Sequence, residues 1–369
     1  MTTKVKGCNN PDFFFQKWKN LPWKAHGRRV FKLQVRMWKA TRRKDKATVL
    51  FLQRLISRSY SARLLAIRQV TQRNAGKKTA GVDGKKSLSC KERFQLESVL
   101  RTQVSTWKSS KLKSVPIPKK SEGTRMLKML TIYDRAWQCL VKLSIEPAHE
   151  AIFHARSYGF RPGRSPWDAR NWDAQKLILS QLSSRANGIR KRILEVDREK
   201  CFDRINHNEL MRRVKAPCEL KQGLWKAPKA GGDPTEYPSQ DRGTPQGGVI
   251  RPLLANIALN GIEDCGGFAP YGRWKHYPAP GIRYADDMVF ILKPNQDAKA
   301  ILTRITQFLS KIGCNVSKSK TRLTASTDGF DFLRWNFRFC TNRKLKIVPS
   351  VDNFLSFRKK VKAIVDSSD

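Results

Sequence analysis

The chain has 369 residues, of which 74 are Lys or Arg and 30 are Asp or Glu, giving a formal net charge of +44. Hydrophobic residues make up 40% of it, which is enough to bury a core and excludes a disordered basic tail. A surface of this charge repels itself unless a polyanion lies nearby, so nucleic acid is the expected partner. No apolar run approaches the roughly 20 residues that cross a bilayer, so no membrane partner is expected.

Residues 1–90 are predicted to form a basic helical extension that includes a glycine-rich loop. Apolar side chains recur at helical spacing from Leu52 to Val70, with four arginines between them, which predicts one amphipathic helix with a basic outer face. The loop NAGKKTAGVDG (74–84) follows and contains Lys77 and Lys78. A basic face is often only solvated, but the overall excess of positive charge favours contact with nucleic acid.

From Val115 onward, short β-like runs alternate with helical stretches, which predicts an α+β domain built around an antiparallel sheet. Loops rich in glycine and proline separate these elements. The expected strands are 115–118, 192–197 and 282–292, and the expected helices are 134–150, 253–262, 299–311 and 351–365.

The sharpest local feature is IRYADDMVFIL (282–292), in which apolar, β-prone residues flank the adjacent Asp286 and Asp287. This pattern predicts a β-hairpin with both aspartates at or near the turn. An ordinary Asp-containing turn is the simpler interpretation. However, the favoured hairpin turns pair Asp with Gly or Asn, and two neighbouring carboxylates repel unless a cation lies between them. Magnesium is typically held by one or two carboxylates together with substrate phosphates.

A further carboxylate comes from RILEVD (192–197), a strand-like run that ends in Asp197. Asp197, Asp286 and Asp287 would meet if the two strands are neighbours in one sheet. Such a set of carboxylates suits phosphoryl transfer with two metal ions. Asp203 is a weaker candidate, because it is equally well explained as a residue on a helix surface.

Together these motifs resemble those of group II intron-encoded reverse transcriptases, or maturases, most closely the cyanobacterial and chloroplast-like kind. YADD (284–287) alone is a modest match, but SYGFRPGRS (157–165), GTPQGG (243–248) and YADD occur together in family order. The resemblance covers most of residues 15–365. The other matching stretches include AIRQVTQRNAGKKTAGVDG (66–84), VPIPKK (115–120), LEVDREKCFDRINHNEL (194–210), GCNVSKSKTRLT (313–324) and GFDFLRWNFR (329–338).

The resemblance implies a right-hand polymerase fold of the α+β class. It would comprise a basic helical N-terminal extension at 1–90, fingers and an antiparallel-sheet palm at 91–345, and the start of a truncated thumb at 346–369. Family members continue through a complete thumb and a maturase domain. The short C-terminal part is therefore the main reason to expect impaired activity.

The resemblance also implies a catalytic site with two Mg²⁺ ions. Asp197 and Asp286 match the metal-binding carboxylates, and Asp287 matches the second acid of the hairpin, so all three are expected at the metal site. The implied reaction is attack of a primer 3′-oxygen on the α-phosphorus of a deoxynucleoside triphosphate, with one metal activating the attacking oxygen and the other stabilising the leaving group.

Five further residues are expected to bind the nucleotide. By resemblance, Lys119 and Arg125 hold the triphosphate, and Phe202 crowds the sugar 2′ position so that a deoxynucleotide is admitted. Gln246 lies near the templating base, and Lys320 lies near the leaving pyrophosphate. Read without the resemblance, Phe202 is a core residue and Lys320 is equally well a solvated lysine.

The expected nucleic-acid contacts are Arg161, Lys77 and Lys78. The implied partners are group II intron RNA, a template–primer, target DNA and deoxynucleoside triphosphates, with a homodimer left open. The implied location is the bacterial cytoplasm, in a ribonucleoprotein with intron RNA, with a plastid as the alternative.

Three functions stay open on the sequence. The first is an RNA-directed DNA polymerase of a group II intron with a maturase role, and the second is a truncated, catalytically impaired remnant that only binds intron RNA. The third, an RNA-directed RNA polymerase, is disfavoured by Phe202 and by the context of Ala285. The sequence departs from the family where RMLKML (125–130) replaces the usual RPLGIP, Arg251 replaces Ser, and Arg334 replaces Gly.

Overall fold

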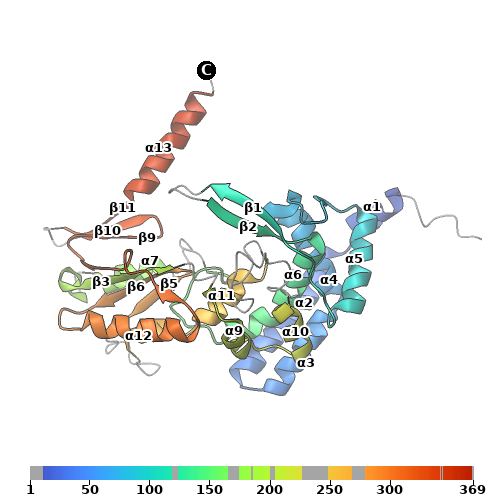
Figure 1. Ribbon diagram of the computed structural model, residues 1–369, viewed down its shortest axis with the longest axis horizontal. Coiled ribbons are helices and arrows are strands. Elements are labelled where there is room, and N and C mark those ends of the chain that lie inside the picture. Colours follow the sequence, from blue (N-terminus) through green and yellow to red (C-terminus); the bar gives the residue numbers. More distant parts are fainter. Residues whose placement is uncertain are drawn as a thin grey trace, which may run out of the picture. The chain divides into compact units, whose positions relative to one another are not determined.

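The computed structural model describes residues 11–118, 124–164, 174–183, 186–199, 204–226, 248–267, 279–340, 342 and 344–367. The chain divides into two compact units (Figure 1). The first comprises Met1–Ile152 with Phe202–Ala258, and the second comprises Phe153–Cys201 with Leu259–Asp369.

The first unit is mainly helical and is organised around one buried helix, α6 (Ile132–Glu150), against which α2, α3 and α4 all pack. Its Thr131 N-cap accepts a hydrogen bond from the backbone N–H of Asp134, which satisfies a donor at the start of the helix. The antiparallel strands β1 (Lys113–Pro118) and β2 (Thr124–Met129) also belong to this unit. The other helices are α1 (Pro11–Lys19), α2 (Trp23–Arg42), α3 (Lys46–Ser57), α4 (Tyr60–Arg68), α5 (Cys90–Gln103), α9 (His207–Arg213), α10 (Cys218–Lys226) and α11 (Arg251–Leu259).

The prediction of one continuous helix from Leu52 to Val70 was wrong. The chain leaves α3 at Arg58 and passes through Ser59, whose φ of −71° and ψ of 128° are extended, before α4 begins. Arg63 is also not on an outer face, because it is 5% exposed and its Nε lies 2.6 Å from Glu97 Oε1. Apolar spacing reports which residues are buried, so two short helices that bury the same side can preserve the period of one.

The second unit is built on a four-stranded antiparallel sheet in the order β5-β6-β3-β8. A three-stranded antiparallel sheet, β11-β10-β9, and α7 lie on one side of it, and α12 lies on the other (Figure 1). The elements are α7 (Ala174–Gln181), β3 (Arg192–Val196), β5 (Gly281–Tyr284), β6 (Asp287–Leu292), α12 (Ala298–Lys311), β8 (Arg322–Ala325), β9 (Phe330–Phe332), β10 (Trp335–Phe339) and β11 (Leu345–Pro349).

One hydrophobic core joins these two sheets. Ile193, Ile282 and Val289 from the larger sheet pack with Phe330 and Phe337 of the smaller one. Within β6 every residue after Asp287 is buried, so this strand reads as a continuous apolar run. The single exposed residue of this strand is Asp287, which is its first residue and lies at the margin of the core.

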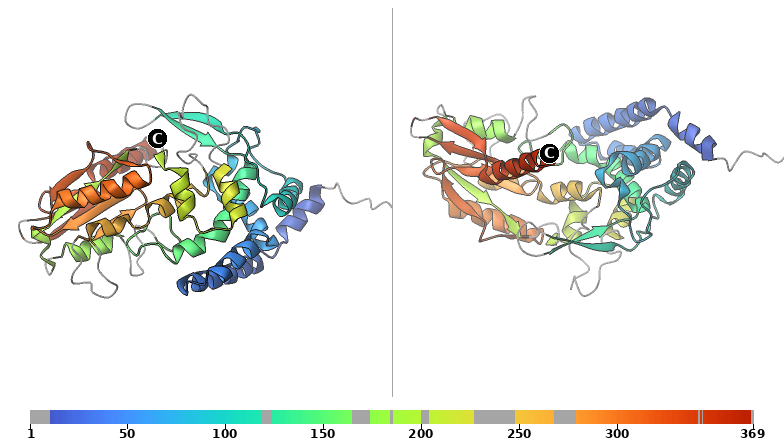
Figure 2. Two further views of the ribbon diagram at one scale, coloured as in Figure 1. Left: turned by 60° about the horizontal axis from the view of Figure 1, so that its bottom comes forward. Right: turned by 90° about the horizontal axis from the view of Figure 1, so that it is seen from above.

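The remaining elements of the second unit are short or peripheral. The two-residue strands β4 (Arg198–Glu199) and β7 (Asn315–Val316) pair with each other. Helix α13 (Val351–Val365) leads away from β11 (Figure 2), and none of its residues is buried. Its Ser350 N-cap accepts from the N–H of Asn353, which explains why the helix begins there.

Most elements expected beyond residue 115 are confirmed, with small differences at their ends. The helix expected at 253–262 stops at Leu259, because Gly261 adopts a left-handed φ of 99° and a 3-10 helix, Ile262–Gly266, follows. The boundaries predicted for the extension, the fingers and palm, and the partial thumb stay predictions. In the part of the chain that the structure describes, no helix has the length and apolarity needed to span a membrane.

Candidate active site

The two adjacent aspartates lie where β5 turns into β6. Tyr284 pairs with Asp287, so Ala285 and Asp286 form a two-residue turn between the strands. Ala285 has a φ of 56°, in the left-handed region that glycine normally occupies in such turns. Asp286 and Asp287 are both exposed. The predicted hairpin with its aspartates at the turn is therefore confirmed.

Asp197 reaches the same edge of the sheet from the neighbouring strand. In the β3–β6 pair, Val196 lies opposite Met288, which places the next residue, Asp197, beside Asp287. The backbone N–H of Arg198 donates to Asp197 Oδ1 at 2.6 Å. The strands are thus neighbours in one sheet, as the meeting of the three carboxylates requires.

Lys320 is held next to Asp197 by the loop that follows β7. The backbone N–H of Ser317 donates to the Asp197 carbonyl oxygen at 2.9 Å, which fastens the loop to the strand end. Lys320 Nζ lies 3.5 Å from Asp197 Oδ2; the lysine side chain is largely exposed and the aspartate side chain is partly exposed. The structure therefore brings four of the predicted site residues together: Asp197, Asp286, Asp287 and Lys320.

The three carboxylates share one electrostatic environment. The pKa of Asp287 is raised to about 6, first by desolvation and then by repulsion from Asp286 and Asp197, while Arg198 opposes the shift. Its carboxylate still reaches solvent, so crowding by neighbouring protein rather than full enclosure causes the desolvation. A bound cation would relieve this repulsion.

These residues suit a magnesium ion that also binds substrate phosphates. They suit less well a metal ion that protein side chains alone enclose. Among the described residues, no group of three or more His, Cys, Asp or Glu side chains is arranged to hold a metal ion by itself. Magnesium keeps several waters and is commonly bound by one or two carboxylates together with substrate phosphates. Carboxylates exposed at a strand edge supply that kind of donor set.

A loop packs directly against the hairpin turn. The N–H of Tyr158 donates to the Arg283 carbonyl oxygen at 2.9 Å, and the N–H of Arg283 donates to the Arg156 carbonyl oxygen at 3.0 Å. A Cβ at Gly159 would lie 2.3 Å from the backbone nitrogen of Ala285. Glycine is therefore needed at this position for the loop to pass so close to the turn.

Arg161 belongs to this loop and is 6% exposed. Its Nη1 donates to the carbonyl oxygens of His154, at 2.8 Å, and Ser157, at 2.6 Å. Its guanidinium also lies 5.2 Å from the centre of the Phe153 ring. Contact of Arg161 with nucleic acid stays a prediction, and its burial favours the role of holding the loop.

Sequence reasoning assigned no role to Arg283, which is completely buried in the strand that precedes the aspartates. Its Nε lies 2.7 Å from Glu263 Oε1, and its Nη2 donates to Ser157 Oγ at 2.7 Å. Its Nη1 donates to the carbonyl oxygen of Ala285 at 3.1 Å. The available clue was a cationic residue inside an otherwise apolar strand, a placement that is rare unless the charge is paired.

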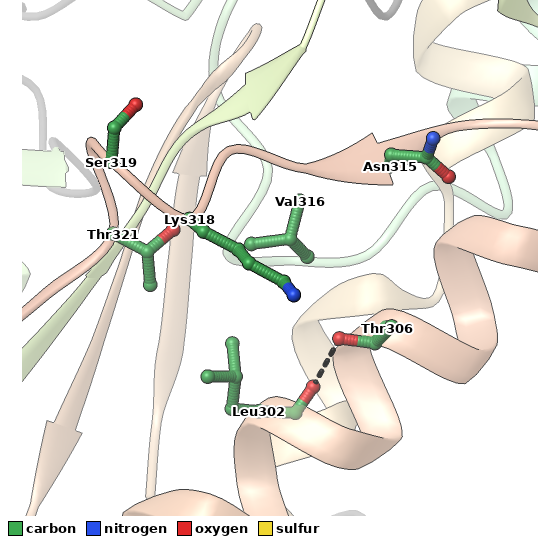
Figure 3. Close-up of a pocket in the computed structure, with 7 residues that line it drawn as sticks. All are labelled: Leu302, Thr306, Asn315, Val316, Lys318, Ser319 and Thr321. Carbon is green, nitrogen blue, oxygen red and sulfur yellow. Dashed lines mark hydrogen bonds between the residues drawn. The ribbon is translucent and has the colours of Figure 1, made fainter.

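A cavity of about 710 Å³ lies between α12 and the loop that carries Lys320. Lys318 extends across it towards the helix, where Thr306 Oγ1 donates to the Leu302 carbonyl oxygen (Figure 3). The loop thus presents Lys320 to Asp197 and Lys318 to the cavity. The cavity is lined by Leu302, Thr306, Asn315, Val316, Lys318, Ser319 and Thr321.

The described part of the first unit contains three further predicted site residues, Lys77, Lys78 and Arg125. Lys77 and Lys78 are exposed in the 3-10 helix Ala75–Lys78, and Lys77 Nζ donates to the Gln72 carbonyl oxygen at 3.1 Å. The backbone of Arg125 pairs with Ile117 in the β1–β2 hairpin. Lys119, Phe202 and Gln246 lie outside the described residues, as does the side chain of Arg125.

Residues 117–337, more than half of the chain, match the family model described as reverse transcriptase (RNA-dependent DNA polymerase). The chain belongs to the reverse transcriptase family. A second model, the N-terminal domain of reverse transcriptase, matches residues 18–100 of this reverse transcriptase. The predicted α+β fold class is confirmed by this membership together with the helices and antiparallel sheets described above.

Individual relatives point to group II introns. Maturase-like protein 1 of Euglena gracilis is 34% identical over 354 residues, which cover 95% of this chain and 72% of the relative. The group II intron-encoded protein LtrA of Lactococcus lactis subsp. cremoris is 33% identical over 149 residues, covering 39% of this chain and 23% of the relative. The predicted membership of the group II intron reverse transcriptases and maturases is confirmed.

Among solved structures, telomerase from Candida albicans, in complex with a fragment of telomeric RNA, is similar with a TM-score of 0.40 and 14% identity. The match covers 66% of this reverse transcriptase and 46% of the telomerase chain.

Proposed function

We propose that this reverse transcriptase copies group II intron RNA into DNA by two-metal nucleotidyl transfer and assists the splicing of that RNA. Family membership supports RNA-directed DNA polymerase activity, and the maturase-like relatives support the second task. The observation that carries the chemistry is the meeting of Asp197, Asp286 and Asp287 at one edge of the sheet.

In this proposal, Asp197 and Asp286, with Asp287 beside them, hold two magnesium ions. When bound, such ions activate the primer 3′-oxygen and stabilise the leaving pyrophosphate. The carboxylates would orient the reacting groups, because they lie at the ends of the paired strands β3 and β6, whose apolar residues are buried. We propose that Lys320, whose ammonium lies beside Asp197, donates a proton to the departing pyrophosphate.

Nucleotide selection is assigned to four further residues. We propose that Lys119 and Arg125 bind the triphosphate, for which cationic donors are suited because its charge is spread over several oxygens. Phe202 would exclude a ribose 2′-hydroxyl, and Gln246 would lie near the templating base. The expected partners are therefore deoxynucleoside triphosphates and a template–primer.

The excess of basic residues supports a tight grip on nucleic-acid backbone, with Lys77 and Lys78 among the contacts. We propose that the protein acts in a ribonucleoprotein with intron RNA and engages target DNA, as a monomer or a homodimer. The bacterial cytoplasm is the proposed compartment, with a plastid as the alternative.

Primer extension on an RNA template tests the proposed activity. The purified chain should extend a DNA primer with deoxynucleotides in the presence of Mg²⁺, and Asp286→Ala should reduce the rate by about a hundredfold or more. Asp328→Ala is the matched control, because Asp328 is an exposed aspartate of the same unit outside the carboxylate edge. Absence of extension, or equal rates for wild type and Asp286→Ala, would refute the polymerase proposal.

The same assay separates the remaining alternatives. Preferential incorporation of ribonucleotides would indicate an RNA-directed RNA polymerase. Salt-sensitive binding to intron RNA without any extension, unchanged by Asp286→Ala, would indicate a binding protein alone. The replacements Arg251 and Arg334 motivate this second possibility, because each adds positive charge while the three aspartates are retained in the sequence.

A further inference from the structure

We propose that Arg283 is the positioning residue of the catalytic hairpin, and that its guanidinium, held by Glu263 and Ser157, fixes the turn that presents Asp286. This inference rests on the proposed function of the aspartates. It assigns a task to a buried ion pair that the reaction itself does not use.

The cost of burying this pair argues that it does more than stabilise the fold. Arg283 and Glu263 are 0% and 1% exposed, so both charges have lost their hydration. The Coulombic attraction of a buried pair often fails to repay that loss, and apolar side chains of similar size frequently stabilise a protein as well or better. A geometric role accounts for a charge at this place in an apolar strand.

The guanidinium joins the hairpin turn to two segments that lie 20 and 126 residues away in the sequence. It binds Glu263 in the 3-10 helix Ile262–Gly266, Ser157 in the loop below the hairpin, and the carbonyl oxygen of Ala285 in the turn. Glu263 is itself oriented, because its Oε2 accepts from the N–H of Gly261 at 3.1 Å. The planar array of donors in arginine can serve three such acceptors at once, which a lysine ammonium cannot do with the same geometry.

The contact with Ala285 links this network to the metal-binding edge. Ala285 adopts a φ of 56°, a conformation that costs a non-glycine residue about 1 kcal/mol or more. Its carbonyl group belongs to the peptide unit that ends at the nitrogen of Asp286. The hydrogen bond from Arg283 therefore opposes rotation of that peptide unit, and such a rotation would redirect the Asp286 carboxylate away from Asp197.

Two variants weaken the network while keeping most of the core. Arg283→Lys retains the charge but loses the planar donors, and Ser157→Ala removes one acceptor only. Arg63→Lys is the matched control, because Arg63 and Glu97 form a second buried Arg–Glu pair among the described residues, with Nε 2.6 Å from Oε1. Thermal unfolding of all three variants reports how much each change affects folding alone.

The kinetic readout is primer extension at saturating template–primer and deoxynucleotide, over a range of Mg²⁺ concentrations. Arg283→Lys and Ser157→Ala should lower kcat by about tenfold and raise the Mg²⁺ concentration for half-maximal rate several-fold. The KM for template–primer should stay within about twofold, because the basic residues that bind the phosphate backbone are not part of this network. Arg63→Lys should destabilise the protein yet leave the Mg²⁺ dependence of the folded enzyme unchanged.

Amide hydrogen exchange provides a readout that needs no activity. Peptides covering residues 281–292 should exchange faster in Arg283→Lys and Ser157→Ala than in wild type, whereas in Arg63→Lys they should not. If wild type fails to extend primers, the proposed function fails while this arm still tests the positioning. The proposal is overturned if folded Arg283→Lys shows wild-type exchange in the hairpin and wild-type Mg²⁺ dependence, or if Arg63→Lys reproduces both losses.

Discussion

At the scale of single residues, Asp287 is a carboxyl group whose ionisation is opposed first by desolvation and then by the neighbouring carboxylates. Its pKa is raised from an ordinary 3.8 to about 6, so the folded protein holds a proton that the unfolded chain releases. Folding stability from this group is therefore fully present below about pH 4, declines as the pH rises through the window between the two values, and is lost above about pH 6.

Replacing Asp287 with Asn should remove the free-energy cost of ionising a carboxyl group at this position. Without metal ions, Asp287→Asn should raise the thermal unfolding midpoint more at about pH 8 than at about pH 5, because only the higher pH ionises the wild-type carboxyl. Thermal unfolding in EDTA measures the difference, and Asp328→Asn is the control for loss of an ordinary exposed carboxylate. An equal gain at both pH values would contradict the assigned cause.

Arg334 is the second residue under local strain. Leu333 and Arg334 form the two-residue turn between β9 and β10, with φ angles of 51° and 71°. A turn with positive φ at both central positions favours Asn-Gly, so a glycine fits the place where the family usually has one.

Arg334→Gly should accordingly stabilise the protein by about 1 kcal/mol, because glycine adopts the left-handed conformation without steric cost. Urea unfolding measures the change. Lys346→Gly is a control that removes the same charge from an exposed position in the extended strand β11, and it should destabilise the protein. A loss of stability in Arg334→Gly would show that the side chain compensates for the strain.

At the scale of elements, the conformation of the hairpin depends on the close approach of a neighbouring loop as well as on hydrogen bonds. The loop that packs against it contains Gly159, where a Cβ would collide with the backbone of Ala285, and Gly163, whose φ is 66° but whose Cβ would meet nothing within 4 Å. Glycine is therefore required at position 159 because there is no room for a side chain, and at position 163 because the backbone is left-handed.

Gly159→Ala should destabilise the second unit by about 2 kcal/mol or more, because the backbone of the turn must move to admit the methyl group. Gly163→Ala should cost about 1 kcal/mol, from its conformation alone. Urea unfolding compares the two variants, and primer extension should fall only for Gly159→Ala. Similar effects on extension would show that the loop does not position the turn.

The sequence predicted elements well where the local pattern and burial agree, and poorly where tertiary packing decides. The hairpin at 282–292 was predictable because apolar, β-prone residues on both sides of the adjacent aspartates mark it locally. The break at Ser59 and the burial of Arg63 were not predicted. Arg63 is buried against Glu97, which lies 34 residues further along the chain. For the same reason the role of Arg283 became visible only once Glu263 and Ser157 were seen beside it.

At the scale of the whole molecule, the net charge of +44 makes nucleic-acid binding dependent on salt. Each phosphate contact releases counterions, so affinity falls with every increase in salt concentration. The exposed lysines Lys77 and Lys78 are expected to contribute such contacts, whereas Lys85 already pairs with Glu92 at 2.8 Å.

Affinity for intron RNA should fall by about a thousandfold or more between about 50 and about 200 mM salt. Replacing Lys77 and Lys78 with Ala should make the salt dependence shallower by about one contact for each lysine. Filter binding or fluorescence anisotropy measures the slope, and Lys85→Ala should leave it nearly unchanged. A slope that is unaffected by Lys77→Ala and Lys78→Ala would exclude these lysines from the interface.

The depth of the Arg283–Glu263 pair has a consequence for how the polymerase moves along its template. Dissolved ions screen exposed charges over about 8 Å at physiological ionic strength, but they cannot enter between two side chains that are 0% and 1% exposed. Added salt should therefore shorten each encounter with the template while leaving the rate of each nucleotide addition nearly constant. The enzyme would lose processivity before it loses catalytic speed.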